Sequence, residues 1–148
     1  QLGRTVLIYA AAALSSCSDR QSPQPDPPVE FPGFNPVSRN LRQVVIGFSS
    51  IADNLELLQH GQIDSPTAAR RIREIKGQMQ EDLAQWRTHP AKERAQARSR
   101  LAAEMLPIGQ RFSHAKKRIE GAANPDASVL QALDRPPRWS DVLGAPLP

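Results

Sequence analysis

The sequence is poor in the residues on which disulfide frameworks, β-sandwiches and catalytic motifs depend. It holds one cysteine in 148 residues, so no intramolecular disulfide can form and cysteine pairing gives no information on the redox compartment. Aromatic residues make up 5% of the chain, which is low for a β-sandwich. The sequence has no glycine-rich phosphate loop, no haem-attachment motif and no nucleophile elbow. These absences favour a helical protein that is not an enzyme.

Candidate metal ligands are also sparse. The three histidines, His60, His89 and His114, are dispersed, whereas a metal site needs side chains that converge. His60 and His89 are expected at opposite ends of a helical hairpin. Glu56 and His60 share a helical face, but a lone pair of this kind is usually a surface pair. The sequence therefore predicts no metal, no cofactor and no small-molecule substrate.

No apolar run is long enough to span a bilayer, which takes about 20 residues. The run over residues 5–16 follows a single positive charge, Arg4. It has the length of the hydrophobic region of a secretory signal, roughly 7–15 residues. Because the chain lacks an initiator Met and has few residues before the run, we expect further residues upstream. Residues 1–16 are predicted to be a signal peptide.

The apolar run closes with Leu14, Ser15, Ser16 and Cys17. This pattern resembles the lipobox of bacterial lipoproteins, a resemblance that covers only the start of the chain. It implies that Cys17 is lipidated, becomes the mature N-terminus and anchors the protein to a membrane. Ser18, where an Asp would favour the inner membrane, implies a periplasm-facing protein of the outer membrane. Two alternatives stay open: a plain cleaved signal, or a buried N-terminal helix in which Cys17 is a small hydrophobe.

Residues 17–36 are predicted to be a tether. Six prolines fall between residues 18 and 36. Proline fixes φ and lacks an amide donor, so such a segment extends by about 3.1 Å per residue. The segment would hold a domain away from the membrane, although an ordinary disordered N-terminus has the same composition. Phe31 and Phe34 are apolar enough to fold back onto the domain or to mark a contact.

Residues 37–134 are predicted to form one helical domain with a modest core. Apolar residues recur at steps of three and four, which places them on one face of a helix. Gly61, the Ser65-Pro66 cap and the break at residues 88–90 separate three such helices. Their apolar seams are Leu41, Val44, Phe48, Ile51, Leu55 and Leu58; Ala69, Ile72, Ile75, Met79, Leu83 and Trp86; and Leu101, Met105, Ile108, Phe112, Ala115 and Ile119.

The first two helices can be docked as an antiparallel hairpin. Apolar residues then face each other at every level, from Leu58 opposite Ala69 to Leu41 opposite Trp86. Charges agree with this register and are predicted to pair across the hairpin, although exposed pairs contribute only about 0–1 kcal/mol each. The predicted pairs are Glu56 with Arg70, Asp53 with Arg73, and Arg42 with Asp82.

The third helix, over residues 90–120, contains Pro107 and is predicted to kink there. Beyond the kink its apolar stripe needs a cover. A short fourth helix with Val129, Leu130 and Leu133 is the predicted cover, and a partner protein is the alternative. The predicted fold class is all-α: an antiparallel three-helix bundle with a kinked third helix and a short fourth helix.

Two features of the sequence are candidates for binding a partner. In the irregular tail, residues 135–148, the spacing of Trp139, Val142 and Leu143 suits a short motif that docks in a partner's groove. The alternative is that Trp139 packs back on the bundle. The second feature is a basic face on the third helix, for which a solvated surface is the alternative. Its candidate residues are Arg94, Arg98, Arg111, Phe112, Lys116, Lys117 and Arg118.

Together these patterns predict a membrane-anchored envelope lipoprotein that binds an envelope protein as an accessory, adaptor or assembly subunit. Such a protein would resemble small helical pilotins in architecture, with no motif in common. The alternative is a basic cytoplasmic protein that binds nucleic acid, in line with the net charge of +4. Against it, the basic cluster lacks interleaved aromatic residues for base stacking.

Overall fold

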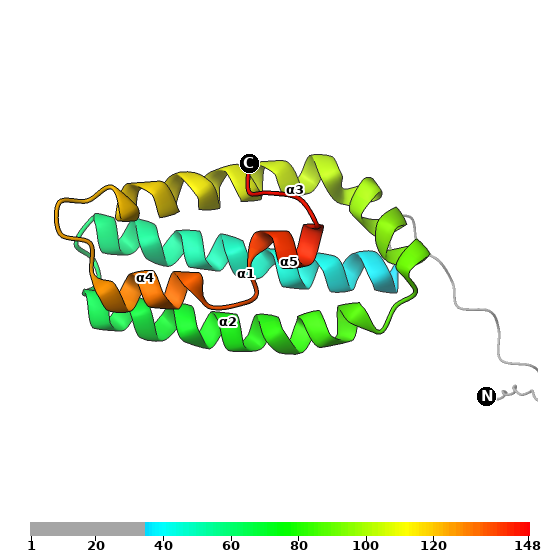
Figure 1. Ribbon diagram of the computed structural model, residues 1–148, viewed down its shortest axis with the longest axis horizontal. Helices are drawn as coiled ribbons and strands as arrows, with labels where there is room; N and C mark the ends of the chain where they lie inside the picture. The colour runs from blue at the N-terminus through cyan, green and yellow to red at the C-terminus, as the bar shows by residue number, and fades with distance from the viewer. Residues whose placement is uncertain (1–34) are drawn as a thin grey trace, which may run out of the picture. The chain divides into compact units, whose positions relative to one another are not determined.

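The computed structural model describes residues 35–148, and this part of the chain is all helical, as predicted (Figure 1). Its helices are α1 (Pro36–Gln59), α2 (Ser65–Arg87), α3 (Ala91–Glu120), α4 (Ala127–Asp134) and α5 (Trp139–Leu143). The predicted signal peptide (1–16), the lipobox with Cys17, and the tether up to residue 34 lie outside the described residues.

Side-chain caps set where α1 and α2 begin. The Asn35 side chain accepts a hydrogen bond from the amide of Ser38 at 3.0 Å and caps α1. Asp64, not Ser65 as predicted, caps α2 by accepting from the amide of Thr67 at 2.9 Å. The correction is one residue, and a carboxylate is the stronger acceptor at the positive end of a helix. Gly61 has a φ of +71° and ends α1 as predicted.

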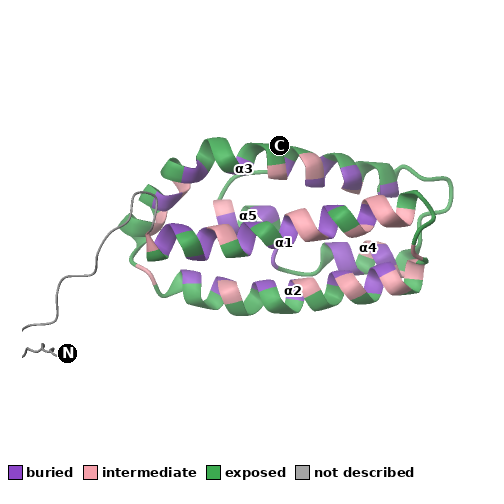
Figure 2. Ribbon diagram, turned by 180° about the vertical axis from the view of Figure 1, so that it is seen from behind, coloured by how far each residue is buried: buried purple, intermediate pink, exposed green. Residues whose placement is uncertain are grey.

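The bundle is built around α1. α1 packs against both α2 and α3, while direct contacts between α2 and α3 are few. α4 packs on α2, and α5 contacts α1. Figures 1 and 2, seen from opposite sides, place α4 and α5 on one face of α1, between α2 and α3. The C-terminal segment from α4 onwards therefore occupies the fourth position of the bundle, so the third helix does not close a three-helix core by itself.

The predicted seams are buried. All seam residues are buried except Leu58, Ile75 and Ile108, which are partly buried against the same core. α1 also buries Val45 and Ala52, which lie beside its seam, because it meets helices on two sides (Figure 2). Each fully buried large apolar side chain contributes about 1.5–3 kcal/mol, so this continuous core holds the fold together.

The contacts between α1 and α2 agree with an antiparallel hairpin. Asn40 donates to the Asp82 carbonyl at 3.3 Å, and Arg71 donates to the Asn54 side chain at 3.4 Å. In the predicted register Asn54 lies opposite Arg73 and Asn40 opposite Arg87, so these contacts are displaced from it by two and five residues, about half a turn and one and a half turns.

The predicted ion pairs across that hairpin are wrong. Arg42 pairs with Glu104 of α3 at 2.7 Å, and Asp53 and Glu56 both pair with Arg111 of α3. The physical reason is angular. The register decides only which residues lie at the same level along the two helices. These three side chains of α1 point toward α3, so they meet charges of α3 and not those of α2.

The apolar stripe of α3 is covered from within the chain, but not in the predicted way. α4 buries Val129 and Leu133 against α2. Over the middle of the bundle the cover is Trp139 of α5, whose ring centroid lies 5.1 Å from that of Phe48. Phe48 in turn lies 5.1 Å from Phe112 of α3. α3 itself continues through Pro107, and its first turns run at an angle to the rest (Figure 1).

Candidate functional site

The predicted basic face of α3 is largely engaged in contacts within the chain. Arg98 lies 5.6 Å from the centre of the Trp86 ring and donates to the Val142 carbonyl at 3.3 Å. Arg118 donates to Gln59 at 3.2 Å, and Lys116 pairs with Glu120 at 2.7 Å. The contacts of Arg98 and Arg118 join α3 to other elements, whereas the Lys116–Glu120 pair lies within α3.

Arg111 is the centre of this network. Its guanidinium contacts Glu56 at 2.7 and 3.0 Å and also Asp53. The hydrogen bond from Arg111 lowers the pKa of Glu56, and the two carboxylates raise the pKa of Arg111. The arrangement links α3 to α1 and leaves the Arg111 side chain 39% exposed.

Two members of the basic face are placed differently. Lys117 is exposed. Nε of Arg94 is buried and has no hydrogen-bond partner among the described residues. Phe112, the one apolar member of the predicted set, is buried in the core with 3% exposure.

The predicted docking motif of the tail packs on its own bundle. Trp139 is 5% exposed, Val142 is fully buried and Leu143 is half-buried. This arrangement corresponds to the alternative interpretation, in which Trp139 packs back. To dock in a partner's groove, these side chains would have to leave the core.

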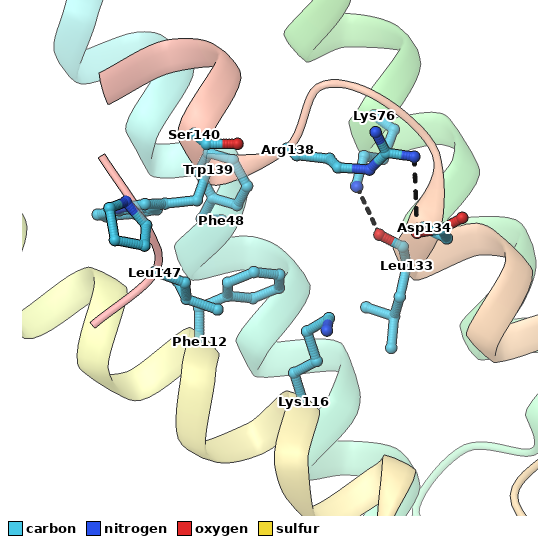
Figure 3. Close-up of a pocket in the computed structure, with 11 residues that line it drawn as sticks. Phe48, Lys76, Phe112, Lys116, Leu133, Asp134, Arg138, Trp139, Ser140 and Leu147 are labelled. Atoms are coloured by element: carbon cyan, nitrogen blue, oxygen red, sulfur yellow. Dashed lines mark hydrogen bonds and ion pairs between the residues drawn. The ribbon is translucent and has the colours of Figure 1, made fainter. Parts of the chain in front are cut away.

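Phe112, Lys116 and Trp139 of the predicted set converge with side chains that the sequence did not mark, above all Lys76 and Arg138, on a pocket of about 210 Å³ (Figure 3). α1, α2, α3 and the C-terminal segment from α4 onwards all contribute to it. The pocket lies where the Phe48, Phe112 and Trp139 rings meet the basic side chains of α2 and α3. Its lining residues are Phe48, Lys76, Phe112, Lys116, Leu133, Asp134, Arg138, Trp139, Ser140, Pro146 and Leu147.

Lys76 is the central polar group of this pocket. Its side chain extends from α2 and is 2% exposed. Nζ donates to the Leu133 carbonyl at 2.8 Å and to the Arg135 carbonyl. Both carbonyls lie at the C-terminal end of α4, where the helix dipole favours a cation. Lys76 therefore holds α4 on α2.

The pocket is electropositive. Burial, followed by the positive charge of Arg138, lowers the pKa of Lys76 to about 8, against smaller opposite effects of Asp134 and Asp141. Arg138 lies 3.6 Å from Asp134 in a loose ion pair, and its amide donates to Asp141 at 2.7 Å. The three cations of the lining outnumber its one carboxylate, Asp134.

One signal in the sequence could have found Lys76. It lies four residues after Ile72 and three before Met79, so it occupies the apolar face of α2. A lysine at such a position must either reach the surface or find acceptors inside. The spacing could not predict that the end of α4 packs there and that its carbonyls accept from Lys76.

Within residues 35–148 no three His, Cys, Asp or Glu side chains lie close enough to hold a metal ion. No helix of the described part is both long and apolar enough to cross a membrane. Comparisons with protein-family models, with curated proteins and with solved structures find no match. The function must therefore be argued from the chemistry of the chain itself.

Proposed function

We propose that the protein is a lipid-anchored accessory subunit of the bacterial cell envelope, whose helical domain binds another envelope protein without catalysing a reaction. The observation that carries the proposal is the setting of Cys17, the one cysteine, directly after an apolar run and Leu14-Ser15-Ser16. Lipidation at this position would anchor the mature chain at its N-terminus. Ser18 favours the outer membrane, with the domain facing the periplasm.

The layout of the chain supports this proposal. The proline-rich segment ends where the first helix begins, since Pro36 is the first residue of α1. A tether of this length, at about 3.1 Å per residue, would hold the domain on the order of 60 Å from the lipid. A compact bundle on such a tether suits a subunit that meets a partner above the membrane.

The alternative, a basic cytoplasmic protein that binds nucleic acid, has less support. It needs the guanidinium groups of α3 to reach phosphates, but Arg98 donates to the Val142 carbonyl and Arg111 is bound to the carboxylates of Asp53 and Glu56. The exposed basic side chains of α3, such as Lys92, Lys117 and Arg118, have no exposed Phe, Tyr or Trp of the same helix beside them for base stacking, so they make a weak nucleic-acid footprint.

The test is membrane fractionation of bacteria that express the full-length protein, with an intact mass for each fraction. We expect the wild type in the outer membrane with added acyl mass, and Cys17→Ala unmodified and absent from it. Ser18→Asp, which leaves the cysteine intact, should keep the acyl mass and move to the inner membrane. If wild type and Cys17→Ala are both soluble at the unmodified mass, the lipoprotein proposal is wrong and nucleic-acid binding becomes the next assay.

A further inference from the structure

We propose that the pocket around Lys76 binds a small organic anion with an apolar body, such as an aliphatic monocarboxylate. The inference does not depend on the membrane anchor. It rests on three features that meet in one place: an excess of cations, a buried ammonium group, and aromatic walls.

The charge argues for an anion. Lys76 is 2% exposed, and its Nζ is held by carbonyl oxygens, which supply partial negative charge only. Arg138 and Lys116 approach the same space from the C-terminal segment and from α3 (Figure 3). A buried cation is costly unless a counter-charge compensates it. An anion between these three groups would supply that counter-charge.

The walls argue for an apolar body. Phe48, Phe112, Trp139, Leu133 and Leu147 line the rest of the pocket. The first three form a chain of ring contacts with centroids 5.1 Å apart, so this side of the pocket is preformed. Pockets with apolar walls and a few convergent polar groups are the usual form of small-molecule sites. An inorganic anion would leave these walls without a partner.

The volume limits the size of the ligand. At about 210 Å³ the pocket is smaller than the roughly 300–1,000 Å³ typical of sites for drug-sized molecules. A short aliphatic chain or a single aromatic ring fits this range, whereas a nucleotide does not. The carboxylate would lie toward Arg138 and Lys116, and the apolar chain would lie toward Phe48 and Phe112.

Octanoate is the probe, titrated into the full chain at pH 7 and followed by calorimetry and by the fluorescence of Trp139 and Trp86. We expect saturable 1:1 binding with a change in tryptophan emission. Octanol, which has the same chain without the charge, should bind at least about tenfold more weakly, because the charge contacts are then missing. This comparison uses the wild type and is independent of the folding of any variant.

Three lysine and arginine variants localise the site. Lys116→Met and Arg138→Met should each weaken octanoate binding by about tenfold, with circular dichroism confirming the fold. Lys117→Met is the matched control, because this lysine is the next residue of α3, is exposed, and does not line the pocket. It should bind octanoate as the wild type does.

Three results would overturn the proposal. The first is the absence of saturable octanoate binding, which would leave Lys76 as a purely structural clamp on α4. The second is equal affinity for octanol, which would mean that the site is only an apolar crevice. The third is an equal loss in Lys117→Met, which would mean that the attraction comes from the overall charge of α3.

Discussion

Raising the pH should stabilise this protein through Lys76. Burial lowers the pKa of Lys76 from 10.5 to about 8 in the folded state. Below pH 8 the folded and unfolded chains both carry the proton, and the folded chain bears the full cost of the buried ammonium. Between pH 8 and 10.5 the folded chain loses the proton while the unfolded chain keeps it, so the free energy of unfolding rises with pH.

The size of this effect follows from the pKa values. A fall from 10.5 to about 8 corresponds to about 3 kcal/mol between the two protonation states. Lys76→Met keeps the apolar stem and removes the titrating group, so it reports the pH dependence of all other groups. The difference in unfolding free energy, wild type minus Lys76→Met, should therefore rise by about 3 kcal/mol from pH 7 to pH 10.5.

Urea unfolding followed by tryptophan fluorescence measures this difference, with Trp86 and Trp139 both buried as reporters. Parallel pH profiles for the two proteins would refute the reasoning, since Lys76 would then titrate alike in both states. A difference that falls with pH would also refute it. The carbonyls of Leu133 and Arg135 would then stabilise the ammonium by more than burial costs.

The remaining predictions concern the attachment of the tail and of α3. A Cβ on Gly109 would lie 2.6 Å from the Trp139 ring, so Gly109→Ala should cost about 1–3 kcal/mol in urea unfolding. A Cβ on Gly77, in the middle of α2, would meet open space, so Gly77→Ala should instead stabilise the protein by up to about 1 kcal/mol. Equal changes in unfolding free energy for Gly109→Ala and Gly77→Ala would contradict the packing of Trp139 on Gly109. Arg111→Met should cost about 1–2 kcal/mol at low salt and clearly less at about 1 M NaCl in thermal melts. Arg118→Met loses a hydrogen bond to the neutral Gln59 and a minor attraction to Glu56, so it should cost no more than about 0.5 kcal/mol at any salt. A salt-independent loss in Arg111→Met would argue against its ion pairs.

The helices and their inner faces could be predicted because their signals are local. A seam such as Leu41, Val44 and Phe48 follows from a period of 3.6 residues, whatever the helix meets. Gly61 and the proline after each break likewise act within a few residues of themselves. The antiparallel docking of α1 on α2 could also be predicted, because only a short turn joins the two helices.

The partners of surface charges could not be predicted in the same way. Glu56 and Arg70 share a level along the hairpin, but Glu56 points toward α3 and meets Arg111. The direction of a side chain around the helix axis matters only once a third helix is placed. That placement depends on contacts between residues more than fifty positions apart in the chain.

The candidate site, too, was predictable only in its local features. The sequence by itself determined an all-helical domain with a heptad core, and it contains the signal-like run that ends at Cys17. Only the tertiary structure decided that Trp139 closes over Phe48, that Arg111 locks α3 to α1, and that Lys76 lies buried beneath the end of α4. The physical reason is that periodicity specifies which face of a helix is apolar, whereas a pocket forms where separate faces meet.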